Sequence, residues 1–108
     1  MATATYKAEG MRVDYTPDGA DVDAGAVIEL NTIIGIATQA IADGEKGSLA
    51  ISGIFSMPKD STAIDQGKAV YWSGSQVNET DTDSYLGKCA ADAASGDSVV
   101  DVLINVNE

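Results

Sequence analysis

The stretch Val100-Asp101-Val102-Leu103-Ile104-Asn105-Val106 near the end of the chain decides the fold class. Its valine and isoleucine side chains recur at every second residue, so in a β-strand they share one face and Asp101, Leu103 and Asn105 share the other. Leu103 is the apolar exception on the polar face. The segment predicts a half-buried β-strand that leaves one apolar side chain on its exposed side.

The same alternation recurs along the chain, and no segment keeps a 3.6-residue apolar rhythm over the length of a convincing helix. Turn sequences such as Asp43-Gly44 and Ser95-Gly96 separate the alternating segments. We therefore predict an all-β fold, a small antiparallel barrel or sandwich, with at most one short helical turn at residues 61–66. The expected strands lie near residues 11–15, 26–30, 33–38, 49–55, 69–73, 85–90 and 100–106.

An internal repeat connects these strands. The run Ile34-Gly35-Ile36-Ala37 resembles Leu86-Gly87-Lys88-Cys89, and a glycine turn follows each at the same spacing. A slip of one residue then aligns Leu49, Ile51 and Phe55 with Val100, Val102 and Val106. We predict two repeated β units, residues 23–58 and 65–106. Chance similarity in a chain rich in alanine and glycine is the alternative.

The length bounds the domain organisation. A chain of 108 residues holds one modest core and leaves no room for a second domain. We expect a flexible N-terminal arm at residues 1–8 and a single β domain at residues 9–108.

The charge excludes several partners. The chain has six Lys and Arg residues, 17 Asp and Glu residues and no His, so its formal net charge is -11 at pH 7. Such a chain repels nucleic acid and anionic membranes. It has no apolar run long enough to span a bilayer, and its first residues do not resemble a signal peptide, so we expect synthesis in the cytoplasm. A single cysteine allows no intrachain disulfide.

Catalytic residues of the usual kinds are missing from the sequence. Without histidine there is no Ser-His or Cys-His pair and no imidazole metal ligand. Cys89 lies in an alternating segment and is expected to be a small buried apolar residue. Gly67-Lys68 is followed by Ala69 and precedes a strand, so it does not match a phosphate-binding loop. We predict a protein that is not an enzyme and holds no cofactor.

Two acidic clusters do not match known sites. Asp18, Asp21 and Asp23 lack the order and the closing glutamate of an EF-hand, so a solvated turn is expected there and no metal. Glu79, Asp81 and Asp83 lie in a polar stretch that reads as an exposed hairpin loop. The remaining enzyme alternatives are an acid-only glycosidase or a Ca²⁺-dependent hydrolase.

Four apolar residues are candidates for a subunit interface. Tyr71 and Trp72 are adjacent, so in a strand they point to opposite faces and one of them is expected to look away from the core. A half-buried tyrosine under a loop would explain the pair equally well. Ile54 and Leu103 fall on the polar side of their strands and add to the interface interpretation.

The order of several motifs resembles a known family. Gly53-Ile54-Phe55-Ser56-Met57-Pro58-Lys59 is followed by Gly67-Lys68-Ala69-Val70-Tyr71-Trp72 and by the closing repeat from Leu86. In order and spacing, from about Tyr6 to Ile104, they resemble the small capsid cement, or head decoration, proteins of tailed bacteriophages. Two residues depart from that pattern: Cys89 stands where Ala or Val is expected, and Ser73 stands where Asp is expected.

The resemblance implies a structural protein of the virion. It would be a β-rich knob, a homotrimer, bound to the major capsid protein lattice on the outside of the head at local three-fold sites. Thr3, Thr5 and Tyr6 would form a capsid-binding arm that adds a strand to capsid protein. The alternatives are a phage tail or baseplate accessory, or a carbohydrate-binding β module with Tyr71 or Trp72 as its aromatic platform.

Overall fold

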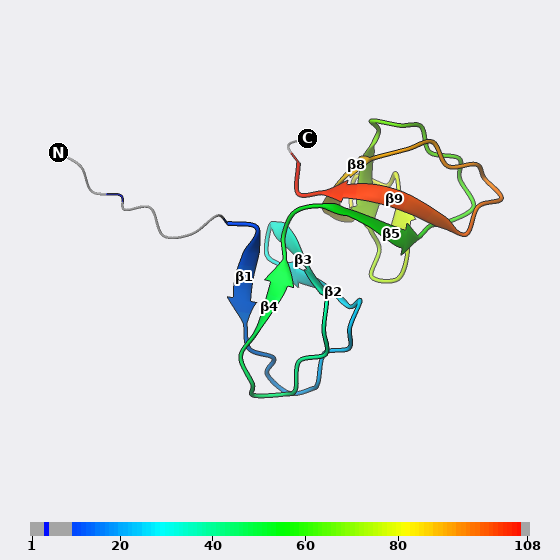
Figure 1. Cartoon of the computed structure of the whole chain (residues 1–108). Helices are drawn as coiled ribbons and strands as arrows, with labels where there is room; N and C mark the ends of the chain where they lie inside the picture. Colours follow the sequence, from blue (N-terminus) through cyan, green and yellow to red (C-terminus); the bar gives the residue numbers. More distant parts are fainter. Residues whose placement is uncertain (1–3, 5–9, 107–108) are drawn as a thin grey trace.

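The computed structural model describes Ala4 and residues 10–106, and every regular element in these residues is a β-strand (Figure 1). The strands form two antiparallel sheets with the orders β1-β4-β3-β2 and β5-β9-β8-β6-β7. The all-β prediction is confirmed; the described strands close no barrel, and a sandwich-like arrangement fits. The strands are β1 (Arg12–Tyr15), β2 (Val27–Leu30), β3 (Ile33–Ala37), β4 (Gly47–Ala50), β5 (Ile54–Pro58), β6 (Ala69–Trp72), β7 (Val77–Asn78), β8 (Ser84–Cys89) and β9 (Val99–Ile104).

The repeated β units are present in the hydrogen bonding as well as in the sequence. Without β7, the second sheet has the strand order of the first, so we name β1 to β4 the first unit and β5 to β9 the second. The Gly25 amide donates to the Ala37 carbonyl over 2.6 Å, and the Gly67 amide donates to the Cys89 carbonyl over 2.8 Å. The boundaries 23–58 and 65–106 stay a prediction.

The third strand of the repeat is aligned differently from the expectation. Ala37 lies opposite Leu49, whereas Cys89 lies opposite Val102, so Leu49 occupies the place of Val102 and not that of Val100. Residues 49–55 are also not one strand, because β4 ends at Ala50 and β5 begins at Ile54. Gly53, at φ +119, turns the chain between them into the second unit.

Residues 61–66 form bends and a turn instead of a helical turn. Ile64 makes a two-way backbone bridge with Ala93, with N···O distances of 2.9 and 2.8 Å. Val22 and Ile41 make the equivalent bridge in the first unit, with both distances 2.8 Å. The bridge competes with helix formation for the same backbone groups, which explains the absence of a helix here.

We call the two faces of each sheet inner and outer, and we assign these names so that equivalent residues of the two units lie on the face of the same name. The inner face of the first sheet includes Ile28 and Leu49, and that of the second includes Val70 and Val102. A small cluster of Val22, Ala37, Ile41 and Leu49 lies on the inner face of the first sheet. A larger cluster lies on the inner face of the second sheet and includes Met57, Val70, Trp72, Cys89, Val100, Val102 and Ile104.

Strand β3 takes part in both clusters. Ile34 and Ile36 point from the outer face of the first sheet into the larger cluster, while Ala37 belongs to the smaller one. The expected single core is therefore two clusters in the described residues, joined by a strand that is buried on both faces. Gly35 lies against Leu49, whose Cδ1 would be 2.7 Å from an added Cβ. Its counterpart Gly87 lies so close to β9 that a Cβ would overlap the Leu103 carbonyl oxygen.

The two units are joined by the side chain of Asn105, just after β9. Strand β4 ends opposite Ile36, so no strand residue faces the backbone of Ile34 on that side. The Asn105 carboxamide takes this place: its Oδ1 accepts from the Ile34 amide at 2.9 Å, and its Nδ2 donates to the Ile34 carbonyl at 2.7 Å. Nδ2 also donates to the Ile51 carbonyl at 2.8 Å. We call this contact the Asn105 clasp, and it gives β3 the hydrogen bonds of a missing strand.

Removing the clasp is expected to lower stability. Asn105 has φ +60, which glycine adopts freely, so Asn105→Gly removes the carboxamide without straining the backbone. Three hydrogen bonds at about 1 kcal/mol each predict a loss of about 2–3 kcal/mol in the free energy of unfolding, measured by urea denaturation. Asn31→Gly, at the other positive-φ asparagine, is the matched control and should change stability by less than about 1 kcal/mol. Equal losses for the two variants would contradict the clasp.

Candidate functional site

The acidic side chains of the first unit bind its own loops. Asp43 Oδ1 accepts from the Gly19 amide, and Asp21 Oδ1 accepts from the Asp43 amide, both over 2.8 Å. These contacts close the loop at residues 17–23 onto the loop at residues 42–45. Within Ala4 and residues 10–106, no group of three His, Cys, Asp or Glu side chains is arranged to hold a metal ion.

The other acidic stretch forms a local turn. Asn78 Nδ2 donates to Asp83 Oδ2 at 2.8 Å, and Asn78 Oδ1 accepts from the Thr80 amide at 2.9 Å. The Asp83 amide donates to the Thr80 carbonyl at 3.1 Å. Like the first cluster, this one is used in shaping a loop, and its carboxylates do not converge on a common point.

The Cys89 thiol is buried and held by backbone groups. Its Sγ lies 2.8 Å from the Ala91 carbonyl oxygen, to which it donates. Burial raises the pKa of the Cys89 thiol above the ordinary value of 9.0, with smaller contributions from the negative charges of Asp92, Asp101 and Asp65. A buried neutral thiol is a poor nucleophile, so the expectation of a small buried residue is confirmed.

Cys89 should therefore react slowly and make stability depend on alkaline pH. The thiol of the unfolded chain ionises first as the pH rises past 9, so the free energy of unfolding should fall above that pH and be unaffected below it. Cys89→Ala should abolish this part of the pH dependence. Reaction with Ellman's reagent should be at least about 100-fold slower in the native protein than in urea. Equal native and unfolded rates would contradict the burial.

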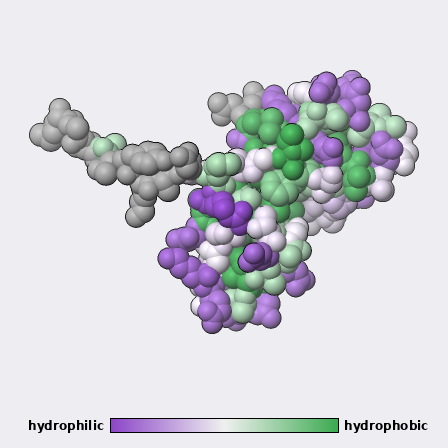
Figure 2. Space-filling model, viewed as in Figure 1, coloured by the Kyte–Doolittle hydropathy of each residue, from purple (hydrophilic) through white to green (hydrophobic). Residues whose placement is uncertain are grey.

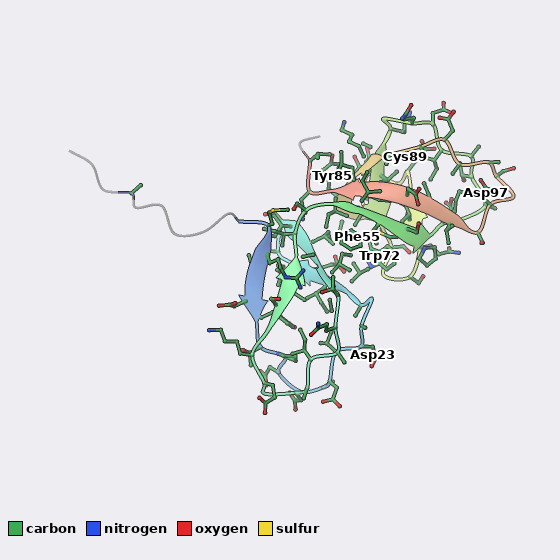
Figure 3. The ribbon with its side chains drawn as sticks, in the orientation of Figure 1. Asp23, Phe55, Trp72, Tyr85, Cys89 and Asp97 are labelled. Atoms are coloured by element: carbon green, nitrogen blue, oxygen red, sulfur yellow. The ribbon has the colours of Figure 1, made fainter. Side chains whose placement is uncertain are left out.

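Tyr71 and Trp72 point to opposite faces of β6, as the strand pattern predicts, and both are buried. Trp72 points into the larger cluster (Figure 3). Tyr71 is buried on the opposite side of the sheet, where its ring meets that of Tyr85 edge to face at a centroid distance of 5.6 Å. Tyr85 in turn donates its hydroxyl to the Val106 carbonyl at 2.8 Å. Tyr71 looks away from the larger cluster as expected, but Tyr85 covers it, so it is not exposed. Neither side chain offers an exposed aromatic platform.

Ile54 and Leu103 form an exposed apolar pair on the outer face of the second sheet. They lie directly opposite each other on β5 and β9, with 62% and 37% of their surface exposed. Val99, further along β9, is exposed as well. Figure 2 shows hydrophobic side chains gathered on the surface over these strands. A subunit interface at Ile54, Tyr71, Trp72 and Leu103 stays a prediction, and Ile54 and Leu103 are its exposed members.

Lys59 has a role that sequence reasoning missed. The residue is 4% exposed, and its Nζ donates to the carbonyls of Asp60 and Ala94 at 2.8 and 3.0 Å and to that of Asp97 at 3.4 Å. Its backbone amide also donates to the Ser98 carbonyl at 3.2 Å. Lys59 thus ties the end of β5 to the loop at residues 91–98. Its position at the end of the Gly53 to Lys59 run was visible in the sequence, but a lone lysine is usually read as solvated.

Replacing Lys59 should loosen this loop. Lys59→Met keeps the apolar stem but removes the ammonium group, and the predicted loss is about 2 kcal/mol or more in the free energy of unfolding. Lys46→Met is the control, because Lys46 is paired with Asp14 at 3.3 Å on the surface and should cost less than about 0.5 kcal/mol. Hydrogen exchange should speed up at the Asp97 amide, which donates within the loop, in the Lys59 variant only. A smaller effect for Lys59 than for Lys46 would refute the role.

A groove of about 330 Å³ lies between the two units. Its apolar lining comes from Val27 and Ile36 of the first unit and from Phe55, Met57 and Trp72 of the second. No charged side chain lines it. A larger hollow of about 500 Å³ lies beside Arg12, whose guanidinium donates to the side-chain hydroxyls of Ser48 and Thr38 at 3.0 and 2.8 Å.

Thr3, Thr5 and Tyr6 of the predicted capsid-binding arm lie outside the described residues. Within the part of the chain that is described, no helix is long and apolar enough to cross a membrane.

Similarity to known proteins is found at the level of a family. The family model described as phage cement protein matches residues 7–104 of the 108. No curated protein matches the chain, and no solved structure does. The matched range covers both units, including the Asn105 clasp's partner Ile34, the exposed pair and Lys59.

Proposed function

Since the chain belongs to the phage cement protein family, a family of structural proteins associated with the phage capsid, we propose that it binds the outer surface of a phage head at local three-fold sites and stabilises the shell. The match over nearly the whole chain is the observation on which this proposal depends. The partner is the lattice of the major capsid protein. The protein would be made in the host cytoplasm and end on the exterior of the virion.

Binding as a homotrimer would suit a protein of this size. A small domain buries little surface against a capsid, so each contact is weak by itself. When three copies are linked, the second and third contacts form intramolecularly, and overall avidity rises by about 10² or more over a single contact. Ile54 and Leu103 are exposed apolar side chains of the kind that a subunit or capsid contact would bury.

The N-terminal segment is the proposed capsid-binding arm. Thr3, Thr5 and Tyr6 would lie in an added strand on capsid protein, where backbone hydrogen bonds give affinity independently of the side chains. The arm would then be separate from the surfaces that hold the copies together.

Deleting residues 1–5 is expected to abolish binding to heads while the subunit assembly is unchanged. Full-length and shortened protein would be mixed with expanded empty heads, and binding measured by co-sedimentation and by density at three-fold positions. The expected affinity loss is at least about 100-fold. Replacing Thr3 and Thr5 by serine is the control, because it leaves the backbone donors and acceptors in place. Undiminished binding of the shortened chain would refute the arm, and absence of full-length protein from heads would favour a tail or baseplate accessory.

A further inference from the structure

The contact between the two units is a stack of one sheet on the other. Val27, Ile34 and Ile36 on the outer face of the first sheet pack onto the inner face of the second, against Phe55 and Met57 among others. The same chain therefore shows what covers an inner face of this fold. It is the outer face of a neighbouring unit.

The stack leaves one face uncovered at each end. At one end, the inner face of the first sheet has only half-buried side chains around its small cluster, including Val13, Tyr15, Ile28 and Leu30. At the other end, the outer face of the second sheet exposes Ile54, Val99 and Leu103. These two faces are of the same two kinds that meet inside the chain.

We propose that copies of this protein associate head to tail, with the outer face of the second sheet of one copy covering the inner face of the first sheet of the next. This proposal rests on the proposed trimer and specifies which two faces meet between neighbouring copies. A contact between two different surfaces closes into a ring when the rotation between copies closes. The partner is a second copy of this chain, because its uncovered face would pack on this one as the two sheets pack on each other within the chain.

Charge favours this arrangement over the pairing of two inner faces. Lys88, opposite Leu103 on the outer face, occupies the place that Ile36 has in the first unit. Residues 12–50 contain seven acidic side chains and two basic ones. Asp101 lies on the same outer face as Lys88 and Leu103, so the charges of this face balance. Pairing two inner faces would bring two acidic units together. Head-to-tail contact instead places a face with balanced charges against an acidic unit, which avoids that repulsion.

The test uses one blocked face per variant of the full chain. Ile54→Glu places a carboxylate on the outer face, and Leu30→Glu places one on the inner face. Sedimentation velocity should show a trimer for the natural chain and monomers for both variants, with at least a tenfold rise in dissociation constant for each. Ser75→Glu adds the same charge in an exposed turn between β6 and β7 and should leave the trimer intact. Circular dichroism and thermal unfolding verify folding; Leu103→Lys replaces Ile54→Glu if that variant unfolds.

Mixing the two variants distinguishes head-to-tail from symmetric contact. The Ile54→Glu copy keeps a free inner face, and the Leu30→Glu copy keeps a free outer face, so the mixture should form a dimer of one copy of each. In ¹⁵N spectra at low salt, shifts should appear on β1 and β2 of the first variant and on β5 and β9 of the second. A monomeric natural chain, a trimeric variant, or a mixture without shifts would overturn the proposal. Binding to heads is measured separately, so a monomer that still binds heads would leave the proposed function standing.

Discussion

The hydrogen bonding of β3 is the constraint on which the rest of the structure depends. This strand contributes to both apolar clusters, yet β4 turns away before it reaches Ile34. A buried backbone amide and carbonyl without partners would cost about 1–3 kcal/mol each. The Asn105 carboxamide, arriving from the end of the other unit, meets both groups and also holds the Ile51 carbonyl. The relative placement of the two units thus depends on the Asn105 side chain, whose carboxamide offers the same donor and acceptor as a peptide group.

The strand content and the repeat could be predicted from the sequence because both depend on local patterns. Alternation with period two identifies a half-buried strand, as in Val99–Ile104, whose burial alternates as expected. The repeated glycines at positions 35 and 87 were visible as well, and the structure explains them by the close approach of the next strand. The exposure of Ile54 and Leu103 followed from the same period.

Other features depend on contacts between distant residues. The prediction of one strand over residues 49–55 was wrong because Gly53 turns the chain. Leu49 and Phe55 still fall at alternate positions on either side of this turn, so the alternating pattern does not reveal it. The opposite directions of Tyr71 and Trp72 followed from the strand pattern, but the ring of Tyr85 on β8 that covers Tyr71 did not. Lys59 and Asn105 are polar residues whose partners are backbone carbonyls far along the chain, and no spacing rule marks such residues.

The burial of Lys59 also makes the surface of the molecule more negative. It removes one of only six cationic side chains from the surface, while the acidic loops at residues 17–23 and 42–45 stay in water. A shell coated with many such knobs would present a dense anionic layer to its surroundings. Particles of this kind repel one another as charged colloids do, so decorated heads would resist clumping in a crowded cell and become sensitive to polyamines and divalent cations.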